Sequence, residues 1–585
     1  MVGRGPQHDD PAQPRTSYWI PPRERLDSMY FTTNDPKSMR RLATVSACLI
    51  TFSVALVACD VFETDLDQVN PQEPTEATYY QNLGQLETGV AGIYEPLEGL
   101  WQRSYYFAHD LLSHDAYGMG SLISNLIPIN NRVHGAGNGV LNDHWNGFYE
   151  AIKNANNIIA AVQGGVEGVS ESDLARIEAE ARFLRALSYY ELVTKYGEVP
   201  LILEVKTEPG GGEPRVSQSQ IYAQILDDLS FAQENLPRKS ELSQPGRATR
   251  GAAYALEGET QLFLGSLENV SVDQGQSAWE EARAAFQTVI ESGEYRLVDN
   301  YFDNFAEGTE NNAESIFEIQ FLRNSSLGTN GRREYEYGML GWRNTTVHPH
   351  AVLEFEDGDP RRGETMFEVC DEFNNGELVK TTSRYEEEMG GCDVEEGQEL
   401  RTVQNYNPDW KKYEYYERGG PWNDTDDGIN LRVIRYAEVL VGLAEAQIEL
   451  GNRTSSNNAS SSAQALLNQV RSRPSVDVEP YPTENYDLSS YENAIETLYH
   501  EYSVEFTGEQ VYYPAQLRSW EHPDRKNYLE PRLQPVQLWP DSPGFDPTRG
   551  QTEDQTDRMR RYWPIPRSEI ESNPEISESD QNPGY

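Results

Sequence analysis

The feature of this chain that most constrains its fold is a helical spacing of apolar residues, repeated in many separate blocks. Within each block, apolar side chains recur every three to four positions, as on one face of an α-helix. Several blocks come in pairs with short connections, and small residues such as Gly251 and Ala252 stand where two helices would touch. Such pairs are typical of tetratricopeptide-like helical hairpins, although the period is too irregular for a strict repeat. We therefore predict a mainly α fold on a helical scaffold, with helices over Leu86–Leu97, His144–Val162, Leu174–Tyr196, Gln220–Leu236, Arg250–Leu264, Ala278–Ser292, Arg432–Leu450, Ala459–Arg473 and Tyr491–Phe506.

The character of the sequence changes between Tyr295 and Ile429. Helical spacing gives way to long polar stretches rich in Gly, Asn, Tyr and Trp, and Ser315–Phe321 has the composition of a short strand. Long aromatic-rich loops in a compact protein are usually functional. The sequence therefore predicts an N-terminal helical region over 79–294, an irregular loop-rich lobe with short β-strands over 295–431, and a C-terminal helical region with C-terminal loops over 432–585.

An apolar run near the N-terminus, Leu42–Ala58, directly follows a basic patch. It is shorter than the roughly 20 residues that span a bilayer, and it ends in small residues before an acidic stretch, as secretion signals do. The junction Leu56–Cys59 resembles a bacterial lipobox, in which the signal is cut before a cysteine that receives diacylglycerol. We predict a lipoprotein signal peptide over 39–58 and lipid attachment at Cys59. An ordinary signal peptide with an incidental cysteine is the alternative.

Met39 is a better start for such a signal than Met1, so we interpret residues 1–38 as an extension ahead of the true translation start. Residues 59–78 then form an acidic tether that would hold the folded domain away from a membrane. Cys370 and Cys392 would remain in the mature domain, where a non-cytoplasmic setting allows them to form a disulfide. A metal site there is less favoured, because no further Cys or His lies nearby in the sequence to complete four ligands.

The chain is strongly acidic, with 95 Asp and Glu against 48 Lys and Arg and a formal net charge of −47. This balance argues against nucleic acid as a partner, because phosphate binding needs a basic surface. At molar salt the Debye length falls to roughly 3 Å and screens such self-repulsion. We therefore favour adaptation to a very salty medium, as in halophilic acidic proteomes, over acidic side chains that serve as cation ligands.

The run Glu180–Ala186, followed by Tyr189–Tyr190 and Lys195–Ile202, has the pattern of an amphipathic helix that ends at a glycine. This run resembles the SusD/RagB family of lipid-anchored nutrient-binding proteins in the outer membrane of Bacteroidetes-type bacteria. Further segments resemble the family in the family's order and cover essentially the whole mature chain: Leu112–Asp115, Asp359–Arg362, Arg432–Leu440 with Ala444–Ala446, Leu467–Arg471, Tyr562–Pro566, Asn573–Pro574 and Gln581–Tyr585.

The run Glu501–Gln510 departs from the resemblance. The family usually has basic residues at positions that are polar here, which puts in doubt the ion pairs those arginines would make. The fold that the resemblance implies is unaffected: a tetratricopeptide-like scaffold with an irregular second lobe.

The function that the resemblance implies is ligand capture without catalysis or cofactor. Family members cap a SusC-like TonB-dependent transporter from outside the cell and deliver oligosaccharide, or sometimes peptide, into it. A lipid-anchored secreted glycoside hydrolase is the main alternative, since catalytic carboxylate pairs are recognised by their separation in space. A helical interaction scaffold is a third possibility. The sequence contains no phosphate-binding glycine loop, no Gly-x-Ser-x-Gly and no His-Glu-x-x-His.

Glycan capture needs aromatic rings that pack on the apolar faces of sugars. In related proteins, the region after the first helix and the irregular lobe tend to form the ligand-binding face. Our candidate ligand-binding residues there are Trp101, Tyr105, Tyr106, Tyr335, Tyr337 and Trp342. We expect Trp101→Ala or Trp342→Ala to weaken ligand binding while leaving the thermal midpoint nearly unchanged. The alternative is that these side chains pack the loops.

Three further patterns are weaker. The aromatic run Trp410–Trp422 looks like a strand with one buried face, so packing is favoured over contact with the transporter. His109 and His114 are five residues apart, a spacing that does not place both on one helical face, so a metal site is not favoured. Asn423–Gly428 is similar to the start of a calcium loop but lacks the bidentate glutamate that such a loop requires. We predict no metal.

Overall fold

The computed structural model describes residues 79–118, 123–130, 132–205, 211–267, 272–322, 333–337, 342, 344–367, 370–374, 377–382, 408–413, 428–454, 462–522, 524–525 and 561–585. Residues Glu76–Tyr585 form one compact unit, which contains the three regions proposed above for the mature domain. The predicted signal peptide, Cys59, the acidic tether, Cys392 and most of the calcium-like loop lie outside the described residues.

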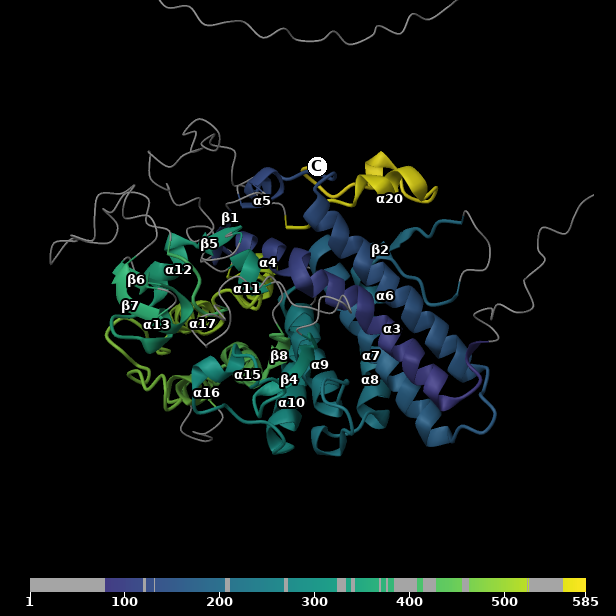
Figure 1. Cartoon of the computed structure of the whole chain (residues 1–585), viewed down its shortest axis with the longest axis horizontal. Helices are drawn as coiled ribbons and strands as arrows, with labels where there is room; N and C mark the ends of the chain where they lie inside the picture. The colour runs from purple at the N-terminus through teal and green to yellow at the C-terminus, as the bar shows by residue number, and fades with distance from the viewer. Residues whose placement is uncertain are drawn as a thin grey trace, which may run out of the picture. The chain divides into compact units, whose positions relative to one another are not determined.

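Helices dominate the described residues and confirm the predicted fold class (Figure 1). They are α3 (Leu83–Gly99), the π-helical turn η1 (Leu100–Ser104), α4 (Tyr105–Ser113), α5 (Ile123–Asn130), α6 (Gly139–Gln163), α7 (Glu171–Tyr196), α8 (Gln218–Asn235), α9 (Arg250–Ser266), α10 (Val272–Glu291), α11 (Arg333–Tyr337), α12 (Pro349–Glu354), α13 (Pro360–Thr365), α15 (Tyr436–Glu449), α16 (Ala463–Arg471), α17 (Tyr491–Phe506), α18 (Tyr512–Glu521) and α20 (Arg567–Ser572).

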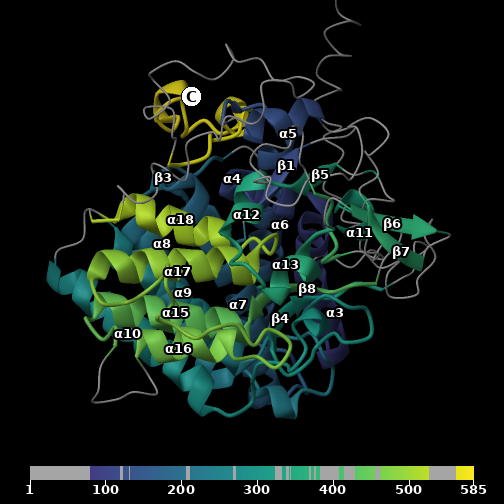
Figure 2. The ribbon, with the colours of Figure 1, turned by 90° about the vertical axis from the view of Figure 1, so that its left-hand side faces the viewer.

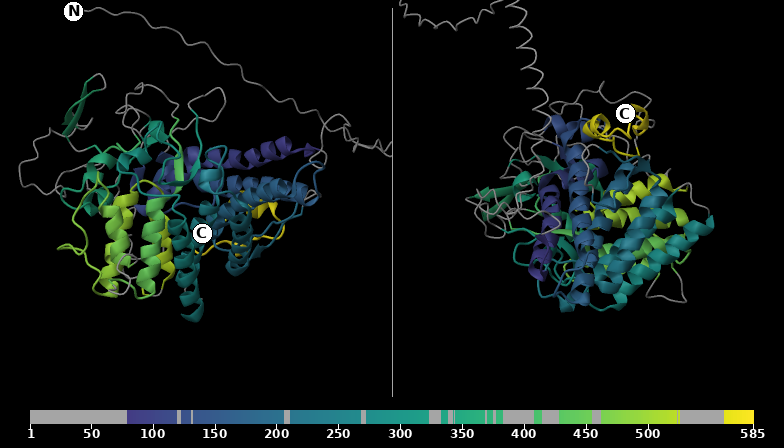
Figure 3. Two further views of the ribbon diagram at one scale, coloured as in Figure 1. Left: turned by 90° about the horizontal axis from the view of Figure 1, so that it is seen from below. Right: turned by 90° about the vertical axis from the view of Figure 1, so that its right-hand side faces the viewer.

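The long helices pack against one another in chain order. α3 packs on α6, α6 on α7, α7 on α8, α8 on α9 and α9 on α10; after the irregular lobe, α15 packs on α10 and receives α16 and α17. Figure 2 shows α15, α16, α17 and α18 side by side, and in the view from below in Figure 3 the teal helices lie between the blue and the yellow-green ones. This succession of helix pairs is the tetratricopeptide-like arrangement that the sequence predicted. None of the described helices combines the length and apolarity needed to cross a bilayer.

Polar side chains cap the N-termini of several of these helices. The Ser170 hydroxyl accepts a hydrogen bond from the backbone N–H of Asp173 at the start of α7, and Thr249 does the same for Ala252 at the start of α9. Asn138 accepts from Val140 and Leu141 at the start of α6. These N-caps satisfy backbone donors that have no partner within the helix, so they fix where each helix begins.

Glycines set the spacing between α9 and α10. A Cβ added at Gly258 would collide with the ring of Phe286, and one at Gly265 with the ring of Trp279. Gly442 on α15 also faces Phe286. The absence of side chains at Gly258 and Gly442 lets α9, α10 and α15 meet around one buried phenylalanine.

The strands form two-stranded antiparallel sheets: β1 (Ala116–Gly118) with β5 (Thr345–Val347), β2 (Val199–Pro200) with β3 (Arg215–Val216), β4 (Ser315–Ile319) with β8 (Leu431–Arg435), and β6 (Cys370–Asn374) with β7 (Glu377–Thr382). The β4 strand confirms the strand predicted at Ser315–Phe321. In the β4–β8 pair, Ser315 lies opposite Arg435 and Ile319 opposite Leu431, with a bulge between them.

The prediction that one helix spans Arg432–Leu450 is wrong at its start. Residues up to Arg435 form β8, and α15 begins at Tyr436. Val433 and Ile434 are β-branched and suit a pleated strand, and β4 supplies the partner. Arg435 has extended backbone angles at the N-cap of α15. A tertiary pairing therefore overrides a local pattern that fits a helix.

Candidate ligand-binding region

Two aromatic clusters that lie far apart in the sequence meet in the structure. Tyr106 on α4 and Tyr337 on α11 have ring centroids 5.0 Å apart in an edge-on arrangement. Tyr337 also stacks on Phe107 at 6.1 Å and contacts the Trp410 ring at 5.2 Å. The structure therefore brings one candidate after the first helix, Tyr106, into contact with one candidate of the irregular lobe, Tyr337.

Arg333 lies at the centre of this cluster. Its guanidinium carbon is 3.9 Å from the ring centroid of Tyr413, 4.9 Å from that of Tyr106 and 5.1 Å from that of Tyr337. Its nitrogens donate to the amide oxygen of Gln510 at 3.1 Å and to the backbone carbonyl of Gly508. A buried guanidinium among tyrosine faces gains cation–π attraction, so Arg333 ties α11 to α4 and to the segment after α17.

Asp110 supplies the negative charge beside Arg333. One carboxylate oxygen lies 3.4 Å from Arg333 and also accepts a hydrogen bond from the Tyr337 hydroxyl. The side-chain amide of Gln510 donates to the same oxygen at 3.1 Å, and its backbone N–H donates to the other at 3.2 Å. Complete burial raises the pKa of Asp110, and the positive charge of Arg333 opposes this shift.

A second aromatic column runs along η1 and α4. Trp101 stacks on Tyr105 with ring centroids 4.0 Å apart, and Tyr105 stacks on His109 at 4.2 Å. The spacing of four residues places the three rings on one face of the helix. Burial lowers the pKa of His109 well below its usual range, so its ring is neutral and packs as an aromatic residue.

The structure places the six candidate residues in different environments. Trp101, Tyr105, Tyr106 and Tyr337 are buried, with exposed fractions of 6% or less. This burial favours the alternative that these four side chains pack the protein interior, and their contact with a ligand stays a prediction. The side chain of Tyr335 lies outside the described residues. Trp342 is 45% exposed, so its ligand-binding role stays a prediction.

Trp342 lies in the sequence between two described contacts. The backbone N–H of Asn344 donates to the carbonyl of Glu336 at 2.8 Å, and the Asn344 side-chain amide donates to the Glu336 carboxylate. Thr345, at the start of β5, then pairs with Gly118 of β1. The residue two positions after the exposed indole is therefore fixed to α11, and the next one to a sheet.

The aromatic run after residue 409 packs inward where it is described. Trp410 is buried and bridges to Met366. Tyr413 is buried and donates its hydroxyl to the carbonyl of Gly508 at 2.9 Å. Between them, Lys412 is buried and pairs with Glu509 at 2.8 Å. The remaining aromatic residues of this run lie outside the described residues.

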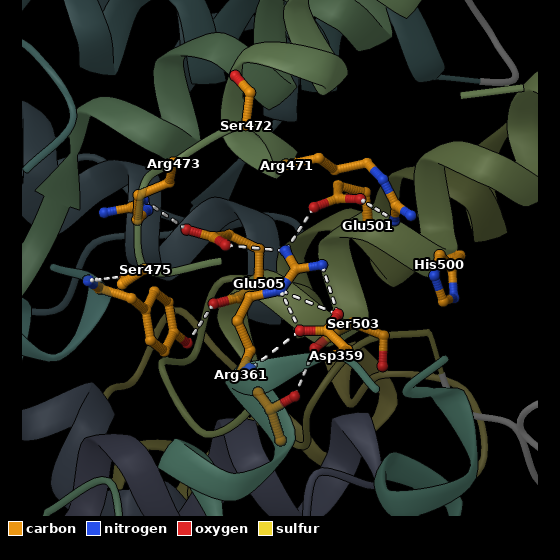
Figure 4. Close-up of polar contacts among 12 residues, drawn as sticks. Asp359, Arg361, Arg471, Ser472, Arg473, Ser475, His500, Glu501, Ser503 and Glu505 are labelled. Atoms are coloured by element: carbon orange, nitrogen blue, oxygen red, sulfur yellow. Dashed lines mark hydrogen bonds and ion pairs between the residues drawn. The ribbon is translucent and has the colours of Figure 1, made fainter. Parts of the chain in front are cut away.

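A buried ion network lies where the lobe meets the C-terminal helices (Figure 4). Glu505 pairs with Arg435 at 2.8 Å and with Arg361 and Arg473 at 3.0 Å each. Glu501 pairs with Arg361 at 2.6 Å. Burial raises the pKa of Glu505, but the three guanidinium groups outweigh it and lower that pKa to about 2, so the carboxylate is ionised.

The run Glu501–Gln510 supplies the acids of this network, and the arginines come from other elements. Arg361 belongs to α13, Arg435 to β8, and Arg473 follows α16. The ion pairs that basic residues within this run would make in the family stay in doubt.

The two histidines of the weak metal pattern do not act together. His109 belongs to the aromatic column, whereas His114 stacks on His348 at a centroid distance of 5.0 Å. Among the residues that the structure describes, no group of three or more His, Cys, Asp or Glu side chains is arranged to hold a metal ion.

Sequence reasoning missed Arg333 and the packing role of Gln510, and it considered Asp110 only next to His109, as part of a weak metal or acid/base pattern. Arg333 could have been suspected from its place just before Tyr335 and Tyr337. The pairing of Arg333 with Asp110 could not have been predicted, because it joins residues from opposite halves of the chain.

Comparisons with known proteins agree with this architecture. Residues 313–585 match the SusD family, and residues 64–259 match a family described as starch-binding and associating with the outer membrane. SusD-like protein P25 from Formosa agariphila is 24% identical over 498 residues, which are 79% of this chain and 87% of that protein.

Solved structures show the same fold. A crystal structure obtained with a xylogluco-oligosaccharide has a TM-score of 0.67 and 20% identity, covering 84% of this chain and 98% of that one. A laminarin-binding SusD-like protein has a TM-score of 0.62 and 23% identity, covering 86% of this chain and all of the other.

Proposed function

We propose that this chain, which belongs to the SusD/RagB family, is a cell-surface lipoprotein that captures an oligosaccharide and passes it to a SusC-like TonB-dependent transporter without chemical change. The observation that carries the proposal is the nearly full-length similarity to SusD-like structures, which include a xylogluco-oligosaccharide complex and a laminarin-binding protein. Peptide remains the alternative ligand that the family resemblance allows.

Trp342 is our candidate for the first sugar contact. An indole offers a wide flat face for stacking on a pyranose ring, and it loses little conformational freedom on binding. Asn344, two residues after Trp342, is hydrogen-bonded to Glu336 of α11, and in this proposal that contact limits the positions of the ring before the ligand arrives. Such preorganisation lowers the entropic cost of binding.

The buried aromatic and charged residues have a supporting role in this proposal. Arg333 and Asp110 hold α11 against α4, and thereby hold the loop of Trp342 in position. No step of the proposed function needs these groups to touch the ligand.

The membrane attachment in this proposal rests on Cys59. An acyl group on this cysteine and the acidic tether over 59–78 would keep the folded domain close to the outer membrane, facing the exterior. Metabolic labelling with a radioactive fatty acid tests this part, with Cys59→Ala as the unlabelled comparison.

Binding without turnover is tested with the purified mature chain and a panel of fluorescently labelled oligosaccharides. We expect at least one xylogluco-, laminari- or malto-oligosaccharide to bind saturably, and we expect every ligand to be recovered intact after prolonged incubation. Cleavage that is abolished by substituting a single Asp or Glu would instead establish the hydrolase alternative.

The partner is tested by mild detergent extraction from cells that express the tagged chain. The proposal predicts co-purification of one large β-barrel protein in a fixed ratio. Recovery of the chain alone, in several detergents and with ligand present, would contradict delivery to a transporter while leaving ligand capture untouched.

A further inference from the structure

Arg132 has no acidic partner among the described residues of this acidic chain. Its side chain is partly exposed, and Nη2 donates to the backbone carbonyl of Leu112 near the end of α4. Nε is buried without a hydrogen-bond partner, and Nη1 donates to no described residue. The described titratable groups that act on this guanidinium are the hydroxyls of Tyr513 and Tyr585. Burial lowers the pKa of Arg132, but a guanidinium stays protonated in a protein, so a positive charge is left unbalanced.

Arg132 also occupies a backbone position that disfavours an arginine. It follows α5, where its N–H donates to the carbonyl of Ile129 at 2.9 Å and the N–H of Val133 donates to the carbonyl of Pro128 at 2.8 Å. This pair of hydrogen bonds is the Schellman arrangement, in which glycine is the usual residue at the position of Arg132. Arg132 has a φ of 53°, in the left-handed region. A side chain held in that region costs free energy, and such positions are frequent at binding sites.

The helix that precedes Arg132 lies beside the sheet that follows Trp342. The side-chain oxygen of Asn130, the last residue of α5, accepts a hydrogen bond from the N–H of Gly118 in β1 at 3.4 Å. β1 pairs with β5, and Figures 1 and 2 both show α5, β1 and β5 side by side. Trp342 precedes β5 by three positions in the sequence. Arg132 and Trp342 therefore adjoin the same two-stranded sheet, one through α5 and the other through β5.

The two segments that meet at this sheet are poor in negative charge. Residues 116–142 and 337–353 contain no Asp or Glu, although 95 of the 585 residues of the chain are acidic. Asp115, just before the first segment, is buried and accepts a hydrogen bond from the N–H of Gly508 at 3.1 Å. Burial raises the pKa of Asp115 well above its usual range, so it adds little negative charge. An anion that most of this chain would repel therefore meets much less repulsion from these segments.

We propose that the captured oligosaccharide is anionic and that Arg132 binds its carboxylate or sulfate group. This inference rests on the function proposed above and narrows its ligand to acidic sugars. A guanidinium makes strong charge-assisted hydrogen bonds to both kinds of oxyanion, whereas a neutral sugar offers no charge to balance it. In this proposal, Trp342 stacks on one sugar ring, and Arg132 pairs with the acidic group of another.

The first test measures binding of the wild-type mature chain to matched pairs of oligosaccharides by calorimetric titration at one ionic strength. One pair is an oligogalacturonate and its methyl ester, and the other is a sulfated galactan oligosaccharide and its desulfated form. We expect the anionic member of at least one pair to bind about tenfold more tightly than the neutral member. The proposal is overturned if neutral glycans bind and neither pair shows this preference. If no glycan of either kind binds, oligosaccharide capture itself fails, and this inference fails with it.

Substitution of Arg132 tests whether this residue causes the preference. Arg132→Gln should reduce the affinity for the preferred anionic oligosaccharide to that for its neutral form. Arg238→Gln removes an exposed positive charge between α8 and α9, and this matched control should keep the preference. If Arg132 merely caps α4, its substitution would lower the thermal midpoint but leave the ratio of the two affinities unchanged. That result would contradict the proposal.

A second test needs no variant and therefore does not depend on whether Arg132→Gln folds. In a crystal structure of the wild type with the preferred anionic oligosaccharide, we expect a carboxylate or sulfate oxygen within hydrogen-bond distance of the Arg132 guanidinium. An acidic group that instead contacts another cation, or that points into solvent, would overturn the assignment of Arg132.

Discussion

At the scale of single residues, Glu505 shows how strongly this fold depends on charges inside it. Its side chain is fully buried, and its carboxylate is shared by Arg361, Arg435 and Arg473. A buried ion pair adds little stability compared with a well-packed apolar pair. Removing one member is costly, however, because the other charges stay buried without a partner.

We therefore predict that Glu505→Gln lowers the free energy of unfolding by about 3–5 kcal/mol. The variant keeps the shape of the side chain, so the loss reports the charge. Urea denaturation measures it, and Glu234→Gln, a surface glutamate on α8, should change stability by less than about 0.5 kcal/mol. Equal midpoints for the two variants would contradict an ionised network.

The two tryptophans that the sequence analysis proposed as ligand contacts differ in their exposure to solvent. Trp101 is 1% exposed, whereas Trp342 is 45% exposed. Contrary to the expectation from the sequence, Trp101→Ala should destabilise the fold by about 3–5 kcal/mol, because it leaves a cavity beside Tyr105 and Phe148. Trp342→Ala should leave the thermal midpoint nearly unchanged. Differential scanning calorimetry of both variants tests this contrast.

At the scale of elements, the close packing of α9, α10 and α15 requires glycine at two contact positions. Gly258 and Gly442 both face the buried ring of Phe286. Gly258→Ala should therefore destabilise the protein by about 1–3 kcal/mol, although alanine favours a helix more than glycine does.

Gly92 provides the matched control for this prediction. It lies within α3, and a Cβ added there would have no atom within 4 Å. Gly92→Ala should raise the free energy of unfolding by about 0.5–1 kcal/mol. If both alanine variants were stabilised, the close packing of α9 on α10 would be refuted.

His500 on α17 lies beside two glutamates, one at the C-terminal end of α12 and one just after it. Its two ring nitrogens lie 3.6 Å from Glu354 and 3.4 Å from Glu356, and its ring stacks on Tyr486 at 3.8 Å. Burial lowers the pKa of His500, but the two carboxylates outweigh it, so that pKa is raised above its ordinary value. The stabilisation from the charged ring is therefore complete below about pH 6.5 and is lost as pH rises through the raised pKa.

We predict that the stability difference between the wild type and His500→Gln is larger at pH 6 than at pH 9. The loss of stacking on Tyr486 is the same at both values, so only the charged contribution changes with pH. Urea denaturation at a series of pH values measures the difference. A difference that does not vary with pH would show that His500 is neutral in the native state.

Local patterns predicted much of the fold. A helix with a clear apolar face, such as α6, was placed from spacing alone, and α17 has the predicted bounds. The second half of α7 is instead buried on nearly all sides, which the predicted amphipathic pattern did not show. The error at Arg432–Arg435 has a tertiary cause, since β4 supplies the strand partner. The partners of Glu505 and Arg333 could not be predicted, because a charged residue gives no local sign of which distant residue will neutralise it.

The candidate site could be predicted only in part. Composition identified the aromatic segments, and the structure brings Tyr106 and Tyr337 together. Which rings are buried depends on how the loops cover them, and this does not follow from spacing in the sequence. Among the fully described candidates for direct ligand contact, Trp342 is the exposed one.

At the scale of the whole molecule, the chain combines an acidic net charge with buried ion pairs. It has a net charge of −47, and several of its arginines are buried, among them Arg361, Arg435, Arg471, Arg473, Arg518 and Arg525. Each of these six is paired with an acid. These arginines are therefore neutralised inside the fold, and adaptation to a salty medium stays a prediction from the composition.

In our proposal, a helical scaffold presents the exposed indole of Trp342 for ligand capture, next in the sequence to the α11 cluster of Arg333 and Asp110. The most direct test is calorimetric titration of the mature chain, Trp342→Ala and Leu203→Ala with the oligosaccharide that binds best in the panel. Leu203 is a partly exposed apolar residue outside the loop and serves as the matched control.

We predict that Trp342→Ala weakens binding at least about tenfold, as expected for the loss of one aromatic stacking contact, and that Leu203→Ala binds as the wild type does. Equal affinities for all three proteins would contradict the assignment of the ligand-binding loop. Absence of binding by the wild type to every glycan in the panel would contradict oligosaccharide capture itself.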